Sequence, residues 1–110
     1  MARTAITVVQ ASRTGATVAY VAADSANGMK FSNTGVELLR VKNADAADKT
    51  VTIDSPGECS QGGTHDLTIV VEAGTEETIG PFPTARFNQS DNTVSVDFSA
   101  ATSTTVAVTK

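Results

Sequence analysis

The stretch that decides the fold is Thr93-Val94-Ser95-Val96-Asp97-Phe98-Ser99, in which apolar and polar residues alternate without a break. An alternation of period two places Val94, Val96 and Phe98 on one face of a β-strand and the polar residues on the other. Shorter stretches with the same pattern are Thr50–Asp54, Leu67–Glu72 and the C-terminal segment around Val106 and Val108. Each of these stretches predicts a strand with one buried face.

Further β-rich segments extend this pattern over most of the chain, and turn residues separate them. They are Ile6–Val9, Thr17–Val21, Met29–Phe31, Val36–Lys42 and Glu77–Gly80. About eight short strands with turns roughly every 8–12 residues are typical of an antiparallel β-sandwich or β-barrel. We therefore expect an all-β fold, with Phe31 and Phe98 in its core. Val36–Lys42 departs from strict alternation, which indicates either that both of its faces are covered or that a bulge shifts its phase.

The N-terminal residues differ from the rest in pattern. Polar residues and glycine surround the short apolar run, so we expect an extended arm over residues 1–16 and a single domain over residues 17–110. Such an arm can pair with its own sheet or add a strand to a neighbour. The 110 residues leave room for one core only.

Charge and cysteine content exclude several classes of function. The net charge is −4, with +3 on residues 1–42 and −7 on residues 43–110. The basic residues do not cluster, so nucleic-acid binding is not expected. No apolar run is long enough for a signal peptide or a membrane span. The single cysteine, Cys59, cannot form an intrachain disulfide, so we expect a reducing cytoplasm or a particle assembled there.

The residues that carry chemistry are too few for a catalytic or metal site. His65 is the only histidine, in a glycine-rich loop without a nucleophile motif, and with Cys59 it supplies two of the four ligands of a structural zinc site. Asn43, Asp45 and Asp48 resemble part of a calcium loop but lack its glycine and final glutamate. We expect no enzyme activity, no cofactor, no metal and no small-molecule substrate.

The most distinctive local feature is Ile79-Gly80-Pro81-Phe82-Pro83. The two prolines fix the backbone on both sides of Phe82 and hold its ring at a small entropic cost. Two interpretations remain open for this ring: it closes one end of the sandwich, or it anchors a contact with a neighbouring subunit.

Three stretches together resemble small virion structural proteins of tailed bacteriophages, of the kind that decorate or cement capsids. They are Gly28–Gly35, then Leu38–Ala44 leading to Thr50–Ile53, then Ile79–Pro83 followed by Phe87–Gln89 and Val94–Val96. The resemblance covers roughly residues 28–108. It implies a protein on the capsid exterior, often a homotrimer, that ties neighbouring capsomers together.

We therefore expect a structural virion protein, assembled in the bacterial host cytoplasm, whose partners are the major capsid protein and copies of itself. Tail or head–tail connector subunits also use small β-sandwiches, and a carbohydrate- or receptor-binding module is a further alternative. The expected partner interface consists of Arg3, Ile6, Val8 and Arg13 in the arm and Phe82 at the proline corner.

Overall fold

The computed structural model of the chain describes residues 3–55 and 66–110. Its ten strands and one short helix follow one another as β1 (Thr4–Ala5), β2 (Val8–Val9), β3 (Val21–Ala22), β4 (Met29–Ser32), β5 (Leu38–Asn43), β6 (Lys49–Ile53), β7 (Leu67–Val71), β8 (Glu76–Ile79), α1 (Thr84–Phe87), β9 (Thr93–Phe98) and β10 (Thr104–Thr109). The expected all-β fold is confirmed.

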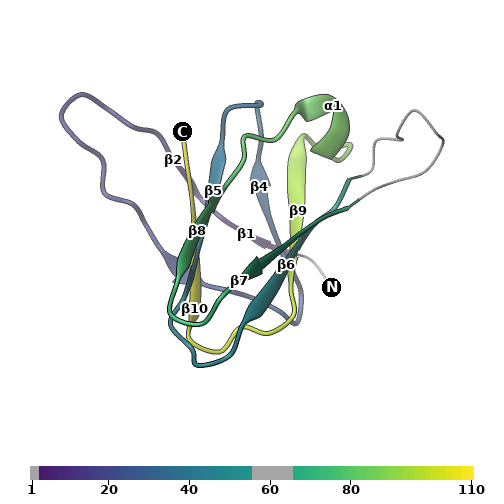
Figure 1. Ribbon diagram of the computed structural model, residues 1–110. Helices are drawn as coiled ribbons and strands as arrows, with labels where there is room; N and C mark the ends of the chain where they lie inside the picture. The colour runs from purple at the N-terminus through teal and green to yellow at the C-terminus, as the bar shows by residue number, and fades with distance from the viewer. Residues whose placement is uncertain (1–2, 56–65) are drawn as a thin grey trace.

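The strands form two five-stranded sheets that pack face to face as a sandwich (Figure 1). The first sheet has the order β1-β4-β9-β6-β7. The second has the order β2-β10-β5-β8, with β3 also paired to β10. Helix α1 lies at one end of the sandwich (Figure 1). The pairs β1–β4 and β2–β10 are parallel, so both sheets are mixed, whereas the sequence pattern predicted antiparallel pairing throughout.

The N-terminal segment does not form a separate arm. Strand β1 joins the edge of the first sheet and β2 joins the second, so residues 4–9 bridge the two layers. Ile6, between them, is 4% exposed and belongs to the core, and its backbone N–H donates to Lys30 O at 2.8 Å. The arm expected over residues 1–16 is therefore not confirmed. Ile6, Val8 and Val9, its apolar run, are held by the chain's own sheets.

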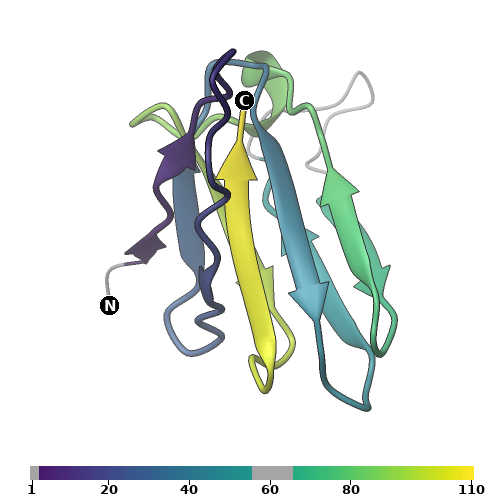
Figure 2. The ribbon, with the colours of Figure 1, turned by 90° about the vertical axis from the view of Figure 1, so that its left-hand side faces the viewer.

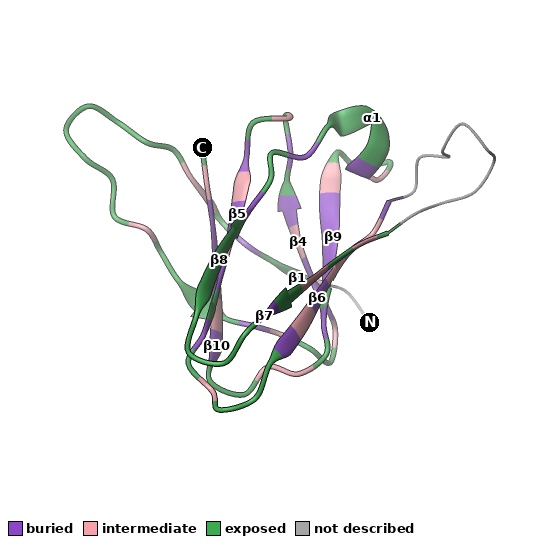
Figure 3. Ribbon diagram, viewed as in Figure 1, coloured by how far each residue is buried: buried purple, intermediate pink, exposed green. Residues whose placement is uncertain are grey.

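The core lies between the sheets and follows the predicted alternation. Val94, Val96 and Phe98 of β9 are buried against inward-facing residues of β5, β6 and β10. In β5 the buried face carries Leu39 and Val41, and the other face is partly covered by the segment that joins β2 to β3. On that outer face Leu38 and Arg40 are half-buried and Lys42 is exposed, so partial cover accounts for an apolar residue at Leu38 (Figure 3). Val36, the other apolar residue out of phase, precedes β5 and is 61% exposed.

Phe82 closes the α1 end of the sandwich from inside. It is 1% exposed, and its ring centroid lies 5.6 Å from that of Phe31 and 5.5 Å from that of Phe87. The amide of buried Asn33 donates to Phe82 O at 2.9 Å, which fixes the backbone of the proline corner to the end of β4. Of the two interpretations of this ring, the structure shows the packing one.

Gly80→Ala is expected to destabilise the protein by about 2 kcal/mol, because Gly80 has φ +127°, a region that only glycine adopts without strain. An added Cβ would also lie 3.0 Å from Glu37 O, which is a backbone atom. Gly74→Ala is the control, since Gly74 has φ +75° but an alanine methyl there would meet no described atom within 4 Å. Urea denaturation of both variants measures the difference, and equal losses would contradict the close-packing argument.

Candidate functional site

The segment between β2 and β3, residues 10–20, is here called the strap. It is anchored at both ends to β10, the central strand of the second sheet (Figure 2). At its start, Ala11 N–H donates to Lys110 O at 2.6 Å and Lys110 N–H donates to Val9 O at 2.9 Å. At its end, β3 pairs with β10 and Ala23 N–H donates to Thr104 O at 3.0 Å. The strap is therefore a loop on two fixed points, as binding loops on rigid scaffolds commonly are.

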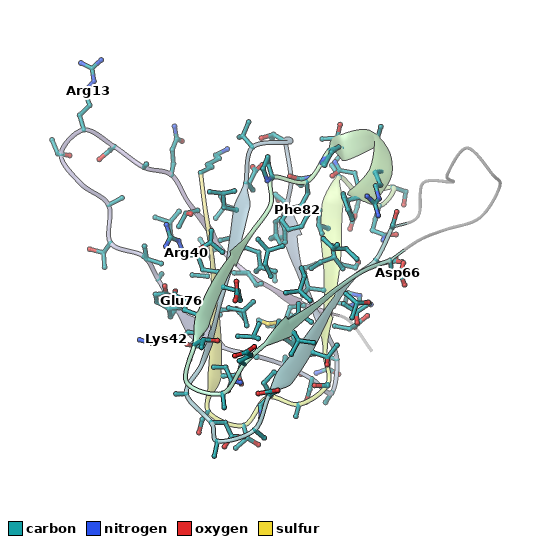
Figure 4. All side chains as sticks on the ribbon, in the orientation of Figure 1. Arg13, Arg40, Lys42, Asp66, Glu76 and Phe82 are labelled. Atoms are coloured by element: carbon teal, nitrogen blue, oxygen red, sulfur yellow. The ribbon has the colours of Figure 1, made fainter. Side chains whose placement is uncertain are left out.

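The tip of the strap is a tight turn that carries Arg13 away from the body of the molecule (Figure 4). Gly15 N–H donates to Ser12 O at 3.1 Å, and the Ser12 hydroxyl donates to Gly15 O at 3.1 Å. Every strap residue except half-buried Val18 is exposed (Figure 3). The strap thus presents a polar, structured projection with one cation at its end.

Tyr20 fastens the C-terminal end of the strap across the second sheet. Its hydroxyl donates to the Glu76 carboxylate on β8, and Lys42 Nζ lies 5.8 Å from the centre of its ring. The hydrogen bond to Glu76 raises the pKa of Tyr20, and burial and the Glu76 charge act in the same direction. The phenol therefore stays neutral and keeps the strap attached at physiological pH.

A cavity of about 330 Å³ lies between the strap and the outer face of the second sheet. Apolar side chains form most of its lining, two of the lining residues are cationic, and none of the described residues that line it is acidic. The lining residues are Val9, Ala11, Ala16, Val18, Leu38, Arg40, Thr109 and Lys110. Arg40 donates from Nε to Thr109 Oγ1 at 3.5 Å, and Lys110 Nζ lies 3.6 Å from the buried Glu37 carboxylate. This cavity, here called the groove, can hold a ligand that has apolar groups and one negatively charged group.

The five residues expected at a partner interface do not form one surface. Arg3 forms an ion pair with Asp97 at 2.8 Å on the first sheet, and Val8 is half-buried in β2. Ile6 and Phe82 are inside the core, so neither side chain is available to a partner in this conformation. Only Arg13 projects from the molecule, at the tip of the strap (Figure 4).

The polar loop after β5 is occupied by its own hydrogen bonds. Asn43 donates to Ala47 O at 2.9 Å, and Lys49 donates to Asp45 at 2.5 Å and thereby lowers the pKa of Asp45.

Cys59 and His65 lie outside the described residues. Within residues 3–55 and 66–110 no three acidic, histidine or cysteine side chains gather where they could hold a metal ion. No helix in that part of the chain has the length and apolar character needed to cross a membrane.

The groove between the strap and β5 was not predicted from the sequence. Its floor is Leu38 and Arg40, which point outward from β5, and its far wall is Ala16 and Val18 of the strap. An outward-facing leucine in an otherwise polar face was the one local signal. The wall depends on how the strap crosses the sheet, and that crossing has no local signature.

Comparison with known proteins identifies no relative: no family model, no curated protein and no solved structure matches this chain.

Proposed function

We propose that this chain is a non-enzymatic structural protein of a tailed-phage virion, which binds the outer surface of the capsid and cements neighbouring capsomers. The observation that carries the proposal is the strap, an exposed projection held at two fixed points above an apolar groove with basic residues. The resemblance of residues 28–108 to decoration proteins supports it. In this proposal the partners are the major capsid protein and further copies of the chain, as a homotrimer.

The physical character of the domain fits a role in adhesion. Of the seventeen buried core residues, seven are valines and four are phenylalanines, and three of those phenylalanines pack against one another. A domain of this size buries a limited apolar area on folding, so its stability when isolated is modest. Docking on a larger body stabilises such a domain by mass action, because only the folded form binds. In the described residues, the surface features favour contact with protein rather than chemistry on a small substrate.

The test compares the occupancy of two charge variants on purified expanded capsids of the encoding phage. Arg13→Glu, at the strap tip, is expected to lower occupancy by about tenfold or more, because one interfacial charge reversal readily costs that much. Lys30→Glu, on the outer face of the first sheet, is the matched control and should bind like the wild type. Deleting residues 2–15 is unsuitable, because the deletion would remove β1, β2 and Ile6.

Imaging of labelled protein on intact particles separates the alternatives. Label over the shell supports capsid decoration, whereas label at one vertex or along the tail overturns it in favour of a connector or tail subunit. Wild-type protein that binds no part of the particle, but binds a glycan saturably, would overturn it in favour of a carbohydrate-binding module. Equal occupancy of Arg13→Glu and wild type would remove the strap tip from the interface.

A further inference from the structure

Among the described residues, Arg40 has no carboxylate partner, and it lies at the floor of the groove under the strap. Its side chain is half-buried, and its described contacts are the long hydrogen bond to Thr109 and the neighbouring Tyr20 hydroxyl. The two other basic residues of the second sheet next to the groove are matched: Lys110 lies near Glu37, and Lys42 lies over the Tyr20 ring beside Glu76. A guanidinium has five N–H donors in a planar fork that fits a carboxylate. Arg40 therefore has N–H donors that make no described hydrogen bond and can bind a ligand in the groove.

The strap offers unpaired backbone beside this cation. Along residues 16–19 the described hydrogen bonds include none from the strap backbone to the rest of the chain. In an extended conformation, four residues would cover about 13 Å, which is the length of a short strand pair. Added strands gain affinity from backbone hydrogen bonds and specificity from the side chains that fit adjoining pockets.

We propose that the groove binds an extended segment of a partner protein that carries a carboxylate between apolar side chains. The carboxylate pairs with Arg40, the apolar side chains contact Leu38, Val9 and Val18, and the segment's backbone pairs with residues 16–19 of the strap. The inference does not depend on the proposed function, because it defines the partner segment by its carboxylate and apolar side chains alone. The chemistry of the segment follows from the groove itself.

The lining and the charge favour this occupant over others. A basic groove for nucleic acid needs clustered cations and stacking aromatics, and here the walls are alanine and valine. A volume of about 330 Å³ is at the low end for a small-molecule pocket. A strand segment also uses the free backbone of the strap, which a small ligand leaves unpaired.

A displayed library of random short peptides, selected on the full chain, tests the proposal. Arg40→Leu serves for counter-selection, and Lys30→Leu is the matched control, since it removes a cation from the outer face of the other sheet. Enriched peptides are expected to carry Asp or Glu flanked by Val, Ile or Leu. Their affinity should fall by about tenfold or more on Arg40→Leu, and also when the peptide acid is changed to its amide. Arg40→Lys, which keeps the charge without the fork, should bind with intermediate affinity.

Backbone amide NMR of the wild type with an enriched peptide supplies a readout that does not depend on variants. Shifts are expected at residues 16–19 and at Leu38 and Arg40. No enrichment, enrichment of peptides without an acid, or affinity unchanged by Arg40→Leu would each overturn the proposal. Self-association of the wild type that Arg40→Leu abolishes would overturn the choice of occupant, because a second copy would then fill the groove.

The two proposals fail separately. Peptide binding that depends on Arg40, together with wild-type protein that does not bind capsids, leaves the groove and removes the capsid role. Wild-type protein that binds capsids, together with no peptide binding that depends on Arg40, leaves the capsid role and removes the groove.

Discussion

Phe82→Ala is expected to lower the free energy of unfolding by about 3–5 kcal/mol, the range for truncating a buried phenylalanine. The ring is 1% exposed and touches both Phe31 and Phe87, so its loss leaves a cavity at the α1 end of the sandwich. Small domains are stable by about 5–15 kcal/mol, so the loss is a large part of the total. Urea denaturation followed by circular dichroism measures it.

Two further measurements make the Phe82 prediction specific. Val70→Ala, at a side chain that is 54% exposed on β7, should change stability by no more than about 0.5 kcal/mol. If Phe82 instead anchored a neighbouring subunit, Phe82→Ala would weaken association and leave the stability of the monomer unchanged. That outcome would contradict the packing described here.

Strands with clean alternation were predictable because each one buries a single face in the core. Thr50–Asp54, Leu67–Glu72 and the stretch around Val96 correspond to β6, β7 and β9 within a residue or two. Thr17–Val21 has the same composition but forms a strand only at Val21–Ala22, where β10 is within reach. A segment with strand propensity forms a strand only where another strand can pair with it, and residues 16–19 make no described backbone hydrogen bond to the rest of the chain.

The parallel pairing of the N-terminal strands has no local signal. Thr4–Ala5 and Val8–Val9 are two-residue strands whose partners lie far away in the sequence, at Met29–Lys30 and Val108–Thr109. The apolar character of Ile6 and Val8 was visible, but a free arm and a bridge between two sheets give the same pattern. The pairing of β1 and β2 with the two sheets and the burial of Ile6 distinguish them.

The candidate site was predictable only in part, because the groove also depends on contacts between segments that are distant in the sequence. Exposure of Arg13 follows from its polar, glycine-containing surroundings, whereas the groove forms where outward-facing Leu38 and Arg40 meet the strap. Phe82 drew attention through its flanking prolines, which rigidify a buried corner as readily as an exposed one. Local rigidity therefore does not show whether a side chain faces the solvent or the core.

Glu37→Gln is expected to lower the free energy of unfolding by about 3 kcal/mol at pH 7, because hydrogen bonds to a buried charged group contribute about 1.5–3 kcal/mol each and do not add fully. The Glu37 carboxylate is 1% exposed and accepts from Thr34 N–H at 2.8 Å, from the Thr34 hydroxyl at 3.0 Å and from Val36 N–H at 3.2 Å. Lys110 Nζ lies 3.6 Å away. Glu77→Gln, at an exposed position of β8, is the control and should change stability little.

The Glu37 contribution is also expected to depend on pH in a definite direction. Burial alone would raise the pKa of Glu37, but the hydrogen bonds from Thr34 and Val36 outweigh it, and the pKa lies below its ordinary value of 4.5. A carboxylate with a lowered pKa in the folded state stabilises the fold fully above its unfolded pKa, and the stabilisation is lost as the pH falls through the folded pKa. Asp24, Asp45 and Asp91 also have lowered pKa values, but they are present in both proteins and cancel in the comparison. The stability difference between wild type and Glu37→Gln should therefore be constant near neutral pH and shrink below about pH 5. A difference that grows on acidification would show that Glu37 is held protonated in the core.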